Sequence, residues 1–151
     1  MNWRFLLSKI FTFAVFSYFC GVIIIGVKIL VLTETDACCG PMATAFLRDY
    51  STTLEVVSAG KNPSKSIDSM VVTAMKECLI DLSDYVPKAV SELDMTTFDQ
   101  VYECPDLPSP ATMEECRVLR DHIKNETYLF FKKSDSKLST LNFQPTLNSQ
   151  L

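Results

Sequence analysis

A long apolar stretch near the N-terminus constrains this chain more than any other feature. Ile10–Val27 contains no charged residue, and Arg4 and Lys9 precede it. This stretch is longer than the ~7–15 apolar residues of a usual secretory signal and approaches the ~20 that span a bilayer. Thr35-Asp36-Ala37 then offers small residues at the −3 and −1 positions of a cleavage site. We expect residues 1–37 to be a cleaved signal peptide, and an uncleaved signal-anchor is the alternative.

Either interpretation places residues 38–151 outside the cell or in an oxidising compartment, because the basic residues before an apolar segment stay in the cytoplasm. The sequence has six cysteines, and Cys20 lies within the apolar stretch. An odd number of cysteines in a secreted domain indicates a leftover thiol or bonds between chains. Without Cys20, five cysteines remain: Cys38, Cys39, Cys78, Cys104 and Cys116.

Charge and histidine content argue against several functions. The formal net charge of −4 disfavours nucleic-acid binding, which needs a concentrated basic face. His122 is the single histidine, so triads built on histidine and multi-histidine metal sites are disfavoured. The acidic pairs Glu114-Glu115 and Asp81/Asp84 are typical of helix ends and solvated surface. We therefore expect no enzyme, no metal and no cofactor.

The spacing of apolar residues after Cys38 predicts an all-α fold. Steps of three and four place apolar side chains on one face of each expected helix, and four Gly and seven Pro are few for a many-stranded sandwich or barrel. Proline near a first turn and Ser or Asn caps set the starts of these helices. We expect helices near residues 41–50, 51–57, 64–82 and 84–101.

The remainder of the chain is expected to be an appendage. Residues 105–131 read as a linker followed by a further helix from Pro110 to about Lys124. Asn125-Glu126-Thr127 is a sequon, which makes Asn125 a candidate for N-glycosylation in a secreted protein. Residues 132–151 are rich in Ser, Thr, Asn, Gln and Lys, so a disordered tail is expected there.

The arrangement of cysteines and short helices in residues 38–104 resembles the secretoglobin family, which includes uteroglobin, mammaglobin and the cat allergen chains. Its members have a cysteine near the mature N-terminus, one in the third helix and one after the fourth. Cys38 or Cys39, Cys78 and Cys104 match these positions. The run Ala74-Met75-Lys76-Glu77-Cys78 also resembles the segment leading to the family's middle cysteine.

This resemblance implies an antiparallel, disulfide-linked dimer with itself or with a sister secretoglobin chain. Carried over, it pairs Cys39 with Cys104 of the other chain, and Cys78 with its own counterpart. Cys38 and Cys116 would then bond to each other or stay reactive.

The resemblance also implies a cavity for a small hydrophobic ligand such as a steroid, a lipid or a pheromone-like molecule. Phe46, Tyr50, Met75 and Phe98 are the candidates to line it, although ordinary core packing explains such residues equally well. Two other functions remain open: a helical cytokine-like signalling factor, and a type II membrane protein with an extracellular helical domain.

Overall fold

The computed structural model describes residues 26–105 and 107–141. The chain forms an α/β fold with three parallel strands in the order β2-β1-β3. Among the described residues, no helix combines the length and apolarity needed to cross a membrane. The elements in chain order are β1 (Val27–Thr33), α2 (Cys39–Tyr50), β2 (Leu54–Gly60), α3 (Ser69–Lys76), β3 (Gln100–Glu103) and α4 (Met113–Leu141).

Strand β1 is the centre of the sheet and its most buried element. Val27 pairs with Leu54 of β2, and Ile29 pairs with Gln100 of β3. Ile29, Leu30 and Val31 have no exposed surface. Side chains of successive residues point to opposite faces of a strand, so β1 is covered on both faces. A strand of this kind reads as a continuous apolar run rather than an alternating one.

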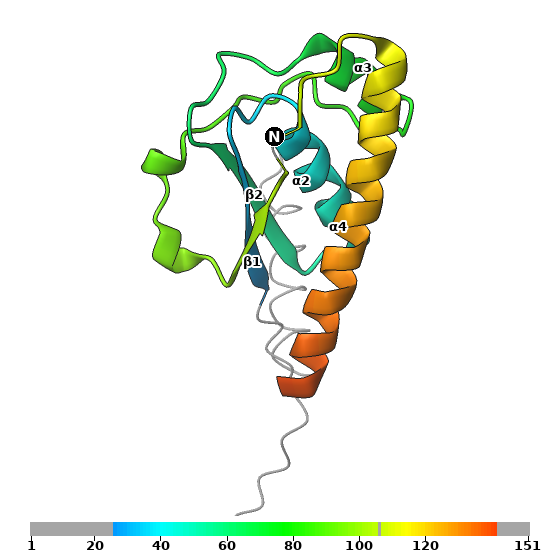
Figure 1. Cartoon of the computed structure of the whole chain (residues 1–151). Coiled ribbons are helices and arrows are strands. Elements are labelled where there is room, and N and C mark those ends of the chain that lie inside the picture. The colour runs from blue at the N-terminus through cyan, green and yellow to red at the C-terminus, as the bar shows by residue number, and fades with distance from the viewer. Residues whose placement is uncertain (1–25, 106, 142–151) are drawn as a thin grey trace, which may run out of the picture.

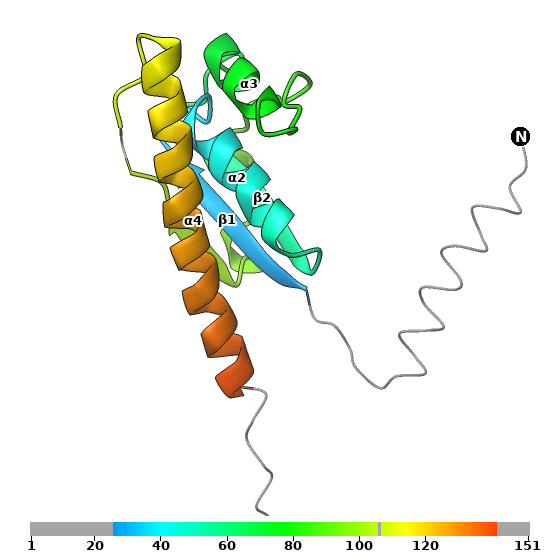
Figure 2. The same cartoon turned by 90° about the vertical axis from the view of Figure 1, so that its right-hand side faces the viewer.

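The helices pack against one face of the sheet, as Figures 1 and 2 show. Helix α2 lies between the sheet and the long helix α4. Met42, Phe46 and Leu47 of α2 are buried in the core, and Cys116 and Ile123 of α4 are fully buried against it. The core therefore forms between β1, α2 and α4.

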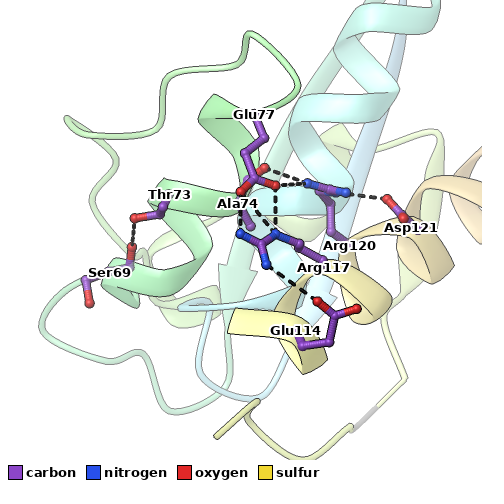
Figure 3. A network of polar contacts seen from close by, with 8 residues as sticks. All are labelled: Ser69, Thr73, Ala74, Glu77, Glu114, Arg117, Arg120 and Asp121. Atoms are coloured by element: carbon purple, nitrogen blue, oxygen red, sulfur yellow. Dashed lines mark hydrogen bonds and ion pairs between the residues drawn. The ribbon is translucent and has the colours of Figure 1, made fainter. Parts of the chain in front are cut away.

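Helix α3 is held to α4 by a cluster of charges, drawn in Figure 3. The carboxylate of Glu77, just after α3, forms ion pairs with Arg117 at 2.8 Å and with Arg120 at 2.9 Å. Arg120 also donates to the carbonyl oxygen of Ala74 at 3.0 Å. The hydrogen bonds from Arg117 and Arg120 lower the pKa of Glu77. These contacts fix the end of α3 beside the first turns of α4.

The end of α3 contains a residue in a left-handed conformation. Leu79 has φ of 62° and a side chain that is 96% exposed. The Leu79 amide donates to the Lys76 carbonyl at 3.0 Å, and the Ile80 amide donates to the Met75 carbonyl at 3.1 Å. This pair of bonds is the Schellman ending of a helix, in which glycine usually takes the left-handed position.

The expected all-α fold is wrong. Residues 51–57 were expected to be helical, but Leu54–Gly60 forms β2. The region expected to hold the fourth helix is instead a loop with two short 3-10 turns, Val90–Glu92 and Met95–Thr97, followed by β3. Parallel pairing with β1 uses the backbone groups of β2 and β3, and this long-range pairing overrides their local apolar spacing.

Other local predictions agree better with the structure. Helix α2 covers the first expected helix, α3 lies inside the third, and α4 begins near the helix expected after Pro110. However, α4 continues to Leu141, so residues 132–141 are helical rather than disordered. Residues 1–25 and 142–151, with most of the expected signal and half of the expected tail, lie outside the described residues.

We predict that Leu79→Gly stabilises the fold by about 1 kcal/mol, because glycine adopts the left-handed conformation without the steric cost of a Cβ atom. The midpoint of urea unfolding measures this change. Leu79→Ala is the matched control, since it also removes the exposed apolar side chain but keeps the Cβ atom. Equal midpoints for the two variants would contradict the prediction.

Candidate functional site

The candidate site lies at the carboxyl end of the sheet, the upper end in Figure 1. The chain leaves β1 through residues 34–38 and enters α2, and the segment after β3 runs beside this loop. In open parallel sheets ligands bind outside the carboxyl ends of the strands, where neighbouring strands connect in opposite directions. Here β1 connects onward to β2 on one side and pairs with β3 on the other. A cavity of about 100 Å³ occurs at this point, lined by Thr33, Glu34, Thr35, Asp36, Cys38, Cys39, Cys104, Pro105, Leu107 and Ser109.

The carboxylate of Asp36 holds the loop between β1 and α2 in shape. Asp36 is 1% exposed and has φ of 52°, a left-handed conformation that Asp tolerates better than most residues. The carboxylate accepts hydrogen bonds from the hydroxyl of Ser58, from the hydroxyl of Tyr85 at 2.8 and 2.9 Å, and from the amide of Lys88 at 3.0 Å. Burial raises the pKa of Asp36, although these bonds act in the opposite direction.

Gly40 allows the Asp36 carboxylate to lie against the first turn of α2. A Cβ atom at position 40 would come within 2.5 Å of Asp36 Oδ1 and 2.6 Å of Ser58 Oγ. These distances are far below van der Waals contact. A larger residue at position 40 would therefore displace the carboxylate from Ser58.

The hydroxyl of Thr33, at the end of β1, forms hydrogen bonds with backbone atoms. It accepts a hydrogen bond from the Asp36 amide at 2.9 Å and donates to the Ala59 carbonyl at 3.5 Å. Thr33 is 8% exposed. A hydroxyl so engaged is a structural group rather than a nucleophile, which leaves the cysteines as the reactive groups of the cavity.

The carbonyl groups of the loop accept hydrogen bonds from the segment after β2. The carbonyls of residues 33, 34, 35 and 37 accept hydrogen bonds from the amides of Lys61, Asn62, Ser64 and Asp68, respectively. Amides near the start of a helix carry partial positive charge and stabilise an anion. The N-terminus of α2, where Cys38 and Cys39 lie, thus favours a thiolate.

Three cysteine side chains meet in the cavity. Contacts with the thiols of Cys104 and Cys38 lower the pKa of Cys39, whereas burial acts in the opposite direction. The same contacts with Cys39, together with burial, raise the pKa of Cys38 and of Cys104. The three thiols therefore titrate as one interacting group, in which Cys39 is the thiol that loses a proton most easily.

The cavity has no cation in its lining. Glu34 and Asp36 contribute carboxylates, and no Lys or Arg is among the residues that line it. Over the described ranges, no three His, Cys, Asp or Glu residues are arranged to hold a metal ion. The site can therefore support chemistry of a thiolate and two thiols.

The four residues expected to line a ligand cavity lie in different surroundings. Phe46 and Met75 are core residues with 2% and 0% exposure. Tyr50 is half-buried, packs against Tyr128 and Phe131, and donates its hydroxyl hydrogen to the Lys124 carbonyl at 2.9 Å. Phe98 is half-buried on the loop before β3, where the Lys28 ammonium lies 5.5 Å from its ring centre.

The predicted disulfide residues are all thiols in this structure. Cys39 and Cys104, expected to bond between chains, lie beside each other in one chain. Cys78 is half-buried after α3, away from the cavity, and Cys116 is fully buried on α4. The predicted glycosylation residue Asn125 is exposed on α4.

Sequence reasoning missed Asp36, Ser58, Tyr85 and Gly40. Thr35-Asp36-Ala37 was interpreted as a cleavage site, and Gly40 only as a helix start. The available signal was the order of elements: an apolar run through Leu32, a short polar loop, and then a helix opening at Gly40-Pro41. That order is typical of a strand, a loop and a helix with a site at the carboxyl end of the strand.

Comparison with known families and structures identifies the type of protein. Residues 28–128 match the family described as low molecular weight phosphotyrosine protein phosphatase. The chain belongs to this family. A comparison with curated proteins finds no match.

Solved structures share the fold at low sequence identity. Wzb of Vibrio vulnificus in complex with benzylphosphonate has 19% identity and a TM-score of 0.64, and covers 72% of this chain and 99% of its own. The YwlE arginine phosphatase of Geobacillus stearothermophilus has 16% identity and a TM-score of 0.63, with 79% and 98% covered. An arsenate reductase in an oxidised state has 17% identity and a TM-score of 0.63, with 70% and 97% covered.

The family match overturns the secretoglobin interpretation and what it implied. The chain is not a secretoglobin-like dimer with a sister chain and a hydrophobic ligand, and neither the cytokine-like nor the helical membrane-domain alternative is supported. The expectation of no enzymatic activity is also wrong, because the family and the similar structures are enzymes. The cysteine spacing led to a wrong prediction because Cys39 and Cys104 lie beside each other in one chain, at the carboxyl end of the sheet.

We predict that the difference in stability between the native protein and Asp36→Asn depends on pH. Because burial raises the folded pKa of Asp36 above its ordinary 3.8, the folded state binds this proton more tightly than the unfolded state. The associated stabilisation is complete below about pH 4 and is lost as the pH rises through the folded pKa. Asn also tolerates the left-handed conformation.

Urea unfolding of both proteins at a series of pH values measures this difference, and subtraction cancels the other titrating groups. The native protein should lose stability relative to Asp36→Asn as the pH rises from about 4. A constant difference, or one that favours the native protein at higher pH, would show that folding does not raise the pKa of Asp36.

We predict that alkylation of Cys39 by iodoacetamide begins at a lower pH than for an ordinary thiol, because the thiolate is the reacting form. Cys104→Ala removes the first hydrogen-bond donor to Cys39 and should raise the pH at which its alkylation is half-maximal. Peptide mass mapping across a pH series measures the midpoint. Cys78→Ala, outside the cavity, is the control and should leave the alkylation midpoint of Cys39 unchanged. An unchanged midpoint in Cys104→Ala would contradict the contact between Cys104 and Cys39.

Proposed function

We propose that the protein is a thiol–disulfide oxidoreductase that uses Cys39 and Cys104. The contact of the Cys39 sulfur with the thiols of Cys104 and Cys38, at the N-terminus of α2, carries this proposal. Hydrogen bonds and the helix end stabilise the Cys39 thiolate, which exists only in the reduced protein. A disulfide whose reduced form is stabilised is a strong oxidant. The oxidised protein would therefore transfer its disulfide to the two thiols of a substrate.

The transfer proceeds in two exchange steps. A substrate thiolate attacks Sγ of Cys104, which belongs to the more exposed of the two residues, and the Cys39–Cys104 bond breaks. Cys39 leaves as a thiolate, and a leaving group of low pKa leaves fastest. The second substrate thiolate then attacks the substrate sulfur bonded to Cys104, and Cys104 leaves and takes up a proton. The substrate loses two electrons and becomes a disulfide, while the protein gains both.

Two further observations support redox chemistry at this site. The fold also occurs in an arsenate reductase that was solved in an oxidised state. In addition, Cys38 provides a second thiol donor to Cys39, so the thiolate keeps a partner when Cys104 is engaged with the substrate.

Hydrolysis of phosphate monoesters is the second candidate function, and family membership favours it. Its substrates would be phosphoproteins or small phosphate compounds, bound by the amides at the start of α2. The charge of the cavity opposes this function. Enzymes that transfer phosphoryl groups stabilise them with Arg, Lys or a metal ion, whereas Glu34 and a Cys39 thiolate would repel a phosphate dianion.

We predict that diamide oxidation of the full-length chain, purified in mild detergent, links Cys39 to Cys104, as peptide mass mapping will show. The oxidised protein should then oxidise dithiothreitol, and Cys39→Ser and Cys104→Ser should each lower this rate at least ~10-fold, because each removes one sulfur of the transferred bond. Cys78→Ser is the control and should retain the rate. Equal rates in all four proteins, or an oxidised protein in which Cys39 and Cys104 remain thiols, would overturn the proposal.

The same preparations distinguish the second candidate. The reduced protein should not hydrolyse p-nitrophenyl phosphate. Hydrolysis that is lost in Cys39→Ser would instead assign the Cys39 thiolate to phosphate chemistry.

A further inference from the structure

A groove beside the thiol cavity has the features of a docking site. It has a volume of about 520 Å³, within the range of about 300–1,000 Å³ typical of ligand sites. It runs between the segment after β3 and the first turns of α4. Its lining is mainly apolar and consists of Leu107, Pro108, Ser109, Pro110, Glu114, Glu115, Val118, Leu119 and His122.

The groove adjoins the thiol cavity. Leu107 and Ser109 line both spaces. A molecule seated in the groove would therefore approach the Cys39 and Cys104 sulfurs along the 107–109 segment.

The walls of the groove suit an extended peptide. Val118 is 63% exposed on the α4 wall, an unusual exposure for a large apolar side chain. Pro108 and Pro110 restrict the backbone of the opposite wall, so less conformational entropy is lost on binding. Apolar side chains of a bound segment would cover Val118 and Leu119.

The charge of the groove selects among such peptides. Glu114 and Glu115 are exposed at its rim, and its lining includes no Lys or Arg. Glu114 has one ion pair, to Arg117 at 3.5 Å. The adjoining thiol cavity adds Glu34. A basic side chain in the bound segment complements this field, whereas an acidic one is repelled.

We propose that this groove binds the substrate of the thiol site, an extended protein segment that carries two cysteines, apolar residues and a Lys or Arg. The proposal rests on the oxidoreductase function proposed above. The groove makes the protein selective for protein dithiols over small ones, because only a peptide reaches both Val118 and the Cys104 sulfur.

Two substrates and two variants test the groove. The substrates are dithiothreitol and a synthetic peptide with two cysteines, flanking leucines and one lysine. Val118→Asn removes the exposed apolar side chain from the wall without adding a charge and without disturbing the core. Leu129→Asn is the matched control: Leu129 is 53% exposed on the same helix, three turns further along, and it is absent from the groove lining.

The oxidised full-length protein should oxidise the peptide about 10-fold more slowly after Val118→Asn, and dithiothreitol at an unchanged rate. Leu129→Asn should leave both rates unchanged. Replacing the lysine of the peptide with glutamate should slow its oxidation by the native protein. Equal peptide rates in Val118→Asn and Leu129→Asn would contradict peptide binding in the groove while leaving the thiol chemistry intact. Failure of the native protein to oxidise dithiothreitol would instead refute the oxidoreductase function itself.

Discussion

The buried carboxylate of Asp36 is the interaction on which the rest of the site depends. Its acceptor atoms join the loop after β1 to two segments that are distant in sequence: β2 through Ser58, and the loop after α3 through Tyr85 and Lys88. Gly40 provides the space for this carboxylate against α2. A buried carboxylate is costly unless it is hydrogen-bonded on all sides, so its partners fix the loop and the helix start together. The cysteines at that helix start are positioned as a consequence.

The electrostatics of the cavity determine which chemistry the family fold can perform here. The partial positive charge at a helix N-terminus can stabilise either a bound oxyanion or a thiolate of the protein itself. In this chain the thiols of Cys38 and Cys104 add their hydrogen bonds to the Cys39 sulfur. A phosphate dianion beside a Cys39 thiolate would find no Lys or Arg in the lining to neutralise it.

Sequence patterns predicted the helices better than the sheet because the two kinds of element are buried differently. Met42, Phe46 and Leu47 follow the helical period because α2 buries one side only. Strand β1 is buried on both sides, so its apolar run merges with the preceding apolar stretch and conceals the strand. The site was missed for a related reason. Asp36 and Ser58 belong to different strand ends, and only the parallel pairing of β1 and β2 brings them together.

Strand β1 also affects how the N-terminal apolar stretch is interpreted. Val27 and the residues through Leu32 extend that stretch in the sequence, yet in the fold they form the central strand between β2 and β3. A cut after Ala37 would remove β1 and Asp36 together, leaving β2 and β3 without the strand that joins them. An intact fold therefore requires the chain to be continuous from Val27 onward. Any targeting function of the N-terminal stretch must then reside in the residues before β1.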